Sequence, residues 1–154
     1  KFFTDIMEIA SYNYKNKVKA IEGAYNFVHN TNLSLYIGSN STHDRIIAGL
    51  QRVELSKYFK PEKIYSFDLV EKPKPYPDIY LKAVEDNKLN KNETIIIEDS
   101  IVGVKAGVSS GVKVIGLTAG GHWYEGRDEQ ELLDAGAFTV TNDYIKIQEI
   151  IESN

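Results

Sequence analysis

One stretch in the middle of the chain, Glu93–Gly111, most constrains the fold. It contains three consecutive isoleucines, Ile95 to Ile97, which follow a polar turn. A short run of β-branched residues is typical of a strand that is buried on both faces, as in a parallel sheet. Ser100 then begins a helix rich in small residues, and Gly111 is its expected end. A buried strand that leads directly into a helix indicates an α/β fold.

Two carboxylates, Glu98 and Asp99, stand where this strand would end. Open α/β sheets bind ligands just outside the carboxyl ends of their strands, and adjacent carboxylates disfavour each other's ionisation. A bound cation relieves that cost, and Mg²⁺ commonly takes carboxylates, waters and a substrate phosphate as ligands. From this stretch alone the alternative is equally good: Asp99 or Ser100 caps the helix, and Glu98 is a solvated loop acid.

Strands and helices alternate along most of the 154 residues. Hydrophobic periodicity predicts helices at Lys1–Tyr14, Ile21–Asn30, His43–Arg52, Asp78–Asn87, Ser100–Gly111, Asp128–Asp134 and Asp143–Glu152, and strands at Leu33–Ile37, Ile64–Phe67, Ile95–Ile97, Val112–Leu117 and Phe138–Val140. Such alternation calls for one parallel sheet with helices on both faces. The sequence therefore predicts a three-layer α/β/α, Rossmann-like fold.

Composition excludes several classes of protein and partner. The net charge is −4 and there is no basic block, so we expect no nucleic-acid partner. The absence of cysteine excludes disulfides, thiol chemistry and cysteine-based zinc sites, and it favours a cytoplasmic location. No apolar run approaches the roughly 20 residues of a membrane span, so no membrane partner is expected either.

Two further loops carry polar groups that suit an anion. After the strand Leu33–Ile37, residues 38–42 read Gly-Ser-Asn-Ser-Thr and lead into a helix, whose N-terminus attracts negative charge. Taken alone, a helix cap at Ser39, Ser41 or Thr42 is the commoner explanation. After the strand Ile64–Phe67, three prolines lie within residues 73–77 and exclude both a helix and a paired strand there. Their fixed backbone would hold Lys74 in one place. A rigid, solvated loop is the alternative there.

All three features would meet at the carboxyl edge of one sheet, because each follows a different predicted strand. Ser39 and backbone N–H groups would hold phosphate oxygens, Lys74 would neutralise their charge, and Glu98 and Asp99 would hold Mg²⁺. Electrostatic stabilisation of this kind is the main requirement of phosphoryl transfer. The combined pattern therefore predicts a phosphate-and-magnesium site.

With these motifs the sequence resembles the haloacid dehalogenase (HAD) superfamily, in particular its β-phosphoglucomutase-like phosphatases. The resemblance covers residues 20–154 and rests on the segments IGSNS, KPYPDIYLKA, IIIEDSIVGVKAG and GVKVIGL. It implies that Ser39 and Asn40 bind phosphate, that Ser39 and Lys74 are catalytic, and that Glu98 and Asp99 bind Mg²⁺. The activity it implies is hydrolysis of a small phosphorylated metabolite, such as a sugar phosphate.

The sequence departs from the family's pattern at the nucleophile. Family members begin with a strand that ends in a DxDGT-like motif, whose two aspartates are the nucleophile and the general acid/base. Asp5 lies in a helical pattern, and Asp68 has no second acid two residues on. We therefore expect residues 1–17 to be the last helix and linker of a helical cap, and residues 18–154 to be a HAD-like core without its first strand.

That missing strand leads to a structural expectation, because it is central in the family's sheet. Its absence would leave backbone groups unpaired at roughly 1–3 kcal/mol each when buried. We expect an N-terminal segment, a retained cleaved piece or a strand from another copy to fill the slot, and the 154 residues alone to be inactive. The functional alternatives are a phosphosugar mutase of the same family or, if the chain is complete, a non-catalytic module that binds phosphate or a partner.

Overall fold

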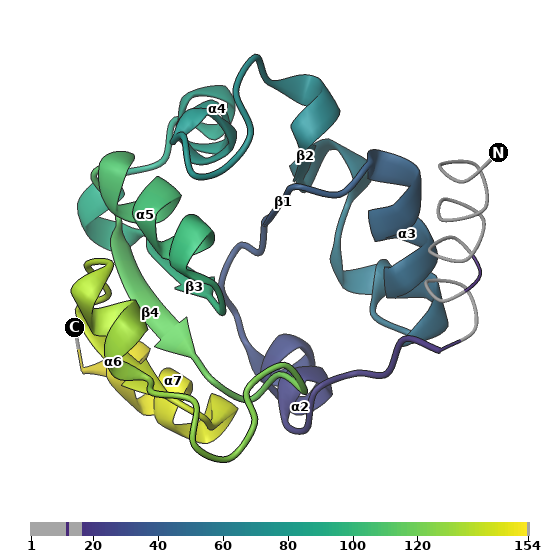
Figure 1. Ribbon diagram of the computed structural model, residues 1–154. Helices are drawn as coiled ribbons and strands as arrows, with labels where there is room; N and C mark the ends of the chain where they lie inside the picture. Colours follow the sequence, from purple (N-terminus) through teal and green to yellow (C-terminus); the bar gives the residue numbers. More distant parts are fainter. Residues whose placement is uncertain (1–11, 13–16, 154) are drawn as a thin grey trace, which may run out of the picture.

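The fold is an alternation of short parallel strands and helices (Figure 1). This computed structural model describes Tyr12 and residues 17–153. The helices are α2 (Ala24–Asn30), α3 (His43–Arg52), α4 (Asp78–Asn87), α5 (Ile101–Ser109), α6 (Gln130–Asp134) and α7 (Tyr144–Glu152). The strands are β1 (Ile37–Ser39), β2 (Ile64–Ser66), β3 (Ile95–Glu98), β4 (Lys113–Leu117) and β5 (Thr139–Thr141). The predicted α/β class is confirmed.

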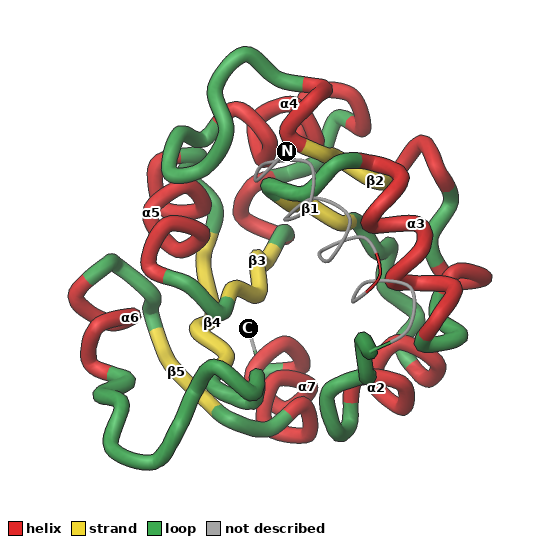
Figure 2. Tube along the Cα trace, turned by 45° about the vertical axis from the view of Figure 1, so that its right-hand side comes forward, coloured by secondary structure: helices red, strands yellow, loops and turns green. Residues whose placement is uncertain are grey.

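The strands pair in parallel, but they form two sheets instead of one. β1 pairs with β2, with Ile37 opposite Ile64, and β3, β4 and β5 form the second sheet, with Ile97 opposite Ile115. In the described residues β1 and β3 do not pair, as a core without its central strand would leave them. Figure 2 shows β1 and β3 at the edges of the two sheets that lie nearest to each other.

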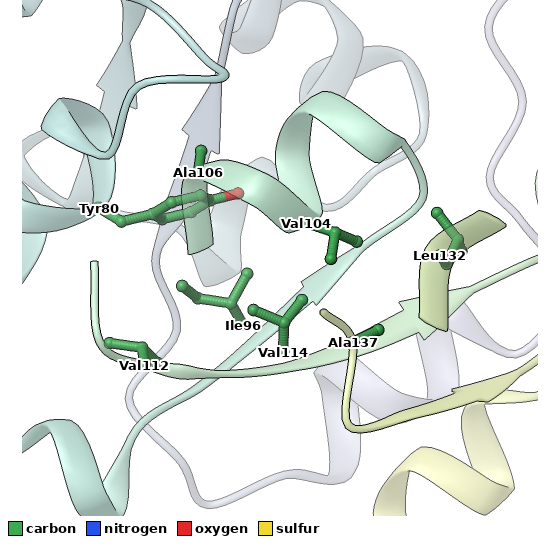
Figure 3. Packing of buried hydrophobic residues seen from close by; sticks show 8 residues of the cluster. All are labelled: Tyr80, Ile96, Val104, Ala106, Val112, Val114, Leu132 and Ala137. Atoms are coloured by element: carbon green, nitrogen blue, oxygen red, sulfur yellow. The ribbon is translucent and has the colours of Figure 1, made fainter. Parts of the chain in front are cut away.

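Side chains alternate along β3 and β4 and build a hydrophobic core on each face. Ile96 and Val114 pack with Val104 of α5 on one face, together with Tyr80 and Leu132 (Figure 3). On the other face, a second cluster holds Phe27 of α2, Ile95 and Ile97 of β3, Ile115 and Leu117 of β4, and Ile147 of α7. This sheet therefore has helices on both faces, as the isoleucine run predicted.

Element boundaries agree with the predictions with one clear exception. The helices at His43–Arg52 and Asp78–Asn87 begin and end at the predicted residues. The strand predicted at Leu33–Ile37 instead covers Ile37–Ser39. These are the three residues that pair with β2, which itself has only three residues. The predicted helix Lys1–Tyr14 and nearly all of the proposed cap segment, residues 1–17, lie outside the described residues.

The described helices include none with the length and apolar character that crossing a membrane requires. The longest of them, α3 and α4, have 10 residues each.

Candidate active site

Side chains from three segments meet where β1 and β3 end. Lys74 lies in the loop before α4, and its Nζ donates to the carbonyl oxygen of Gly38 in β1 at 2.9 Å. The same ammonium is ion-paired with Oε1 of Glu98, the last residue of β3. Gly38 precedes Ser39 and Glu98 precedes Asp99, so the lysine bridges the carboxyl ends of the two sheets. The structure thus places the three predicted motifs together.

The Asn40 side chain holds the backbone of Lys74 in place. Its Nδ2 donates to the Lys74 carbonyl oxygen at 3.0 Å, and its Oδ1 accepts from the Lys74 N–H at 2.9 Å. The Asn40 amide thus hydrogen-bonds both the N–H and the carbonyl group of Lys74. Asn40 therefore ties the proline-rich loop to the end of β1.

The Ser39 hydroxyl shapes the turn that leads into α3. Its Oγ accepts a hydrogen bond from the Ser41 N–H at 3.1 Å. A hydroxyl that accepts in one contact still has its own hydrogen to donate. Thr42 is the N-cap residue of α3, and its side chain makes no capping hydrogen bond. Ser39 therefore presents a donor at the end of β1, close to the Gly38 carbonyl that Lys74 contacts.

Glu98 is buried, and both of its carboxylate oxygens are occupied. The side chains of Lys74 and Glu98 are only 7% and 8% exposed. Oε1 accepts from the Tyr80 hydroxyl at 2.5 Å as well as from Lys74. Oε2 accepts from the Asp99 N–H at 3.2 Å and from the Ser100 hydroxyl at 3.3 Å. This carboxylate has the partners that a buried charge requires.

Asp99, its neighbour, is in a different environment. Its side chain is 47% exposed, and burial, followed by the charge of Glu98, raises the pKa of its carboxyl. Its carbonyl oxygen accepts from Trp123 Nε1 at 3.0 Å and lies 3.1 Å from His122 Nε2. The same imidazole nitrogen lies 3.7 Å from Asp99 Oδ2. The main chain of Asp99 is therefore fixed, while its carboxylate remains accessible.

The loop that contacts Asp99 is itself braced against α6. The Arg127 guanidinium carbon lies 3.9 Å from the centre of the Trp123 ring, and its NH1 donates to the His122 carbonyl oxygen at 3.2 Å. Arg127 Nε also donates to Glu131 of α6 at 2.5 Å. Stacked cations and charge-assisted hydrogen bonds are among the stronger polar contacts of proteins. The position of Asp99 therefore depends on the loop that follows β4.

The site offers oxygen ligands of the kind that Mg²⁺ prefers. Asp99 supplies an accessible carboxylate, and Mg²⁺ usually completes its octahedron with waters and substrate oxygens. No cluster of three or more His, Asp or Glu side chains suited to a metal occurs among the described residues. The donor chemistry thus fits Mg²⁺, while most of its ligands would have to come from water, substrate or other protein groups.

Comparison with known proteins identifies the family. Residues 1–117 match the sequence pattern of haloacid dehalogenase-like hydrolases. The chain belongs to this family. Among its relatives is a protein named phosphorylated carbohydrates phosphatase, from Thermotoga maritima, which is 29% identical over 132 residues. That match covers 85% of the HAD-family chain but only 56% of the relative, so the chain spans about half of the relative's length.

Solved structures agree with this assignment. A haloacid dehalogenase-like protein of unknown function from Agrobacterium tumefaciens is 29% identical, with a TM-score of 0.90 over 99% of this chain and 68% of its own. A HAD family hydrolase from Deinococcus radiodurans, solved with bound phosphate and sodium, is 26% identical, with a TM-score of 0.82 over 98% of this chain and 67% of its own. The predicted HAD-like fold is confirmed.

Two residues of this HAD-like site escaped the sequence reasoning. Tyr80 is buried in α4, and Gly103 lies in the first turn of α5. A Cβ atom at Gly103 would lie 1.9 Å from Glu98 Oε2, so the glycine makes room for the carboxylate. A usable signal existed for Tyr80, because a tyrosine at a buried helix position needs a partner for its hydroxyl.

The candidate site lies at the carboxyl ends of β1 and β3. A cavity of about 960 Å³ lies elsewhere in the HAD-like core, between α2 and α7. Phe27, Thr118 and Tyr144 are among its lining residues, which include none of the predicted site residues. The charged groups with defined partners lie at the strand ends and not in this cavity, so the strand ends form the candidate active site.

Proposed function

We propose that this HAD-family protein serves in Mg²⁺-dependent hydrolysis of small phosphomonoesters, with sugar phosphates as the leading substrate class. The observation that carries the proposal is the position of Lys74, which contacts Gly38 beside Ser39 and Glu98 beside Asp99. A cation between a hydroxyl and an accessible carboxylate suits a phosphate with its metal ion. The name of the Thermotoga relative supports sugar phosphates as substrates, and the phosphate bound to the Deinococcus hydrolase supports a phosphate site.

We assign the phosphate contacts to Ser39, to Lys74 and to the turn between Ser39 and α3. The Ser39 hydroxyl and the N–H groups of this turn donate to phosphate oxygens, at a helix N-terminus that favours an anion. Lys74 neutralises the charge of the phosphoryl group. Asn40, which was predicted to bind phosphate, belongs to the same site and also holds the Lys74 backbone.

For the predicted metal-binding pair, Glu98 and Asp99, we propose unequal roles. The contacts favour Asp99 as the direct ligand, because each Glu98 oxygen already accepts from two donors. Glu98 then acts chiefly through Lys74. A Mg²⁺ ion bound here would offset the negative charge of the phosphoryl group during its transfer.

We further propose that the nucleophile lies on an additional strand. The family resemblance implies an aspartate nucleophile, whereas Asp68 lies in a 3₁₀ turn after β2 and Asp5 lies outside the described residues. Within the described part of the chain, β1 and β3 each leave one edge without a strand. A strand between them, from a segment beyond these 154 residues or from another copy, would pair both edges and reach Lys74.

A phosphatase assay on the natural gene product tests this proposal. A panel of sugar phosphates and other phosphomonoesters would be incubated with Mg²⁺ or with EDTA, and released phosphate measured. We expect release that requires Mg²⁺ and falls at least about a hundredfold in Ser39→Ala, Lys74→Ala and Asp99→Asn. Undiminished turnover in Asp99→Asn contradicts the metal assignment. Isomerised sugar phosphate identifies a mutase, and phosphate binding without any turnover identifies a binding module.

A further inference from the structure

Tyr80 contacts both members of the buried ion pair. Its hydroxyl donates to Glu98 Oε1 at 2.5 Å, and the centre of its ring lies 4.8 Å from Lys74 Nζ. The residue is 9% exposed and belongs to the core cluster between α4, α5 and the sheet (Figure 3). One rigid side chain of α4 thus touches the cation and the anion of the candidate site.

These contacts determine the position of the Lys74 ammonium from three elements. The Gly38 carbonyl comes from β1, the Glu98 carboxylate from β3 and the aromatic ring from α4. A lysine ammonium on a flexible stem has three donors and adopts many geometries when its partners are mobile. Glu98 can hold it in one place only if the carboxylate is itself held, and the Tyr80 hydroxyl binds the same oxygen as Lys74.

We propose that Tyr80 is a positioning residue for the phosphate site. Its hydroxyl keeps Oε1 of Glu98 turned toward Lys74, and Glu98 in turn holds the ammonium at the ends of β1 and β3. This inference rests on the proposed function, because that function makes Lys74 a phosphate ligand.

A second buried tyrosine provides a matched control. Tyr65 of β2 is 3% exposed, and its hydroxyl accepts from Asn87 Nδ2 of α4 at 2.8 Å. Like Tyr80, it joins α4 to another element through side-chain hydrogen bonding. Tyr65→Phe therefore also removes a buried hydroxyl that contacts α4, at a position for which no contact to Lys74 or Glu98 is seen. A merely structural role of Tyr80 predicts that the two phenylalanine variants bind phosphate with the same affinity.

The test measures inorganic phosphate binding by calorimetry, with Mg²⁺ present, in the wild type and both variants, and the urea midpoint of each. We expect both variants to lose stability, with the larger loss in Tyr80→Phe, because its hydroxyl binds a charged carboxylate. We expect Tyr80→Phe to weaken phosphate binding by about tenfold, because a hydrogen bond to a charged group is lost, and Tyr65→Phe to change it by less than about twofold. Equal phosphate affinities in the two variants would overturn the proposal.

Two further experiments test the role of Tyr80. In a Glu98→Gln background, Tyr80→Phe should weaken phosphate binding no further, because the hydroxyl acts through that carboxylate; fully additive losses would contradict this. If the wild type binds no phosphate, the proposed function fails, and a crystal structure of Tyr80→Phe decides the positioning role separately. Lys74 displaced from Gly38 supports the role, and an unmoved lysine refutes it.

Discussion

Replacing Lys74 with methionine tests whether the ion pair with Glu98 holds the two sheets together. The substitution leaves a carboxylate that is 8% exposed without its cation. Breaking a buried ion pair by removing one partner typically costs about 3–5 kcal/mol. Glu98 keeps the donors from Tyr80, Asp99 and Ser100, so we expect the lower end, about 3 kcal/mol. That is a large part of a typical stability of roughly 5–15 kcal/mol.

Urea denaturation at pH 7, followed by circular dichroism, measures this free energy of unfolding. The double variant Lys74→Met/Glu98→Gln should recover much of the loss, because the unpaired charge is removed with its partner. Lys82→Met is the control, since its pair with Asp86 on α4 is 40% and 46% exposed. Such surface pairs contribute about 0.3–0.5 kcal/mol. If Lys74→Met destabilises no more than Lys82→Met, the ion pair does not hold the sheets together.

Three more predictions concern the groups around this pair. Gly103→Ala should abolish measurable phosphate binding in calorimetry, because its Cβ would lie 2.0 Å or less from the Glu98 carboxylate and displace it; wild-type affinity would contradict this. Trp123→Phe removes the donor to the Asp99 carbonyl oxygen and should weaken Mg²⁺ binding about fivefold in a titration, in line with one lost hydrogen bond; an unchanged affinity argues against this role of the loop. Burial raises the pKa of Tyr144 above 10.0, so its contribution to stability is complete below that pH and is lost as pH rises further. Tyr144→Phe should therefore lose less stability than the wild type between pH 10 and 11 in urea denaturation. Equal losses would contradict a raised pKa of Tyr144 in the folded state.

Much of the fold was predictable because hydrophobic spacing and turn residues are local signals. The helices at His43–Arg52 and Asp78–Asn87 begin and end where those signals predicted. Strand pairing is not local, and the sequence could not show that β2 would find partners only in residues 37–39. The same limit explains why hydrophobic runs alone did not show that the described strands pair as two sheets. An apolar run predicts a buried strand without naming its neighbours.

The candidate site was predictable as a group of residues, but their partners were not. Lys74, Ser39 and the acidic pair follow different strands, and the common direction of those strands brings them to one rim. Glu98 and Asp99 both carry carboxylates, so the sequence alone does not distinguish them. Packing buries Glu98 and leaves the side chain of Asp99 47% exposed. That difference arises from Tyr80 and Gly103, which lie on different helices.

A crystal structure of the protein with Mg²⁺ and inorganic phosphate tests the central claim most directly. The claim is that Ser39, Lys74 and Asp99 form one site for a phosphate and its metal ion. We predict a phosphate within hydrogen-bonding distance of Ser39 Oγ and Lys74 Nζ, and a six-coordinate ion at about 2.0–2.1 Å from an Asp99 oxygen. Phosphate bound at another surface, with Lys74 and Asp99 free of ligand, would contradict the account.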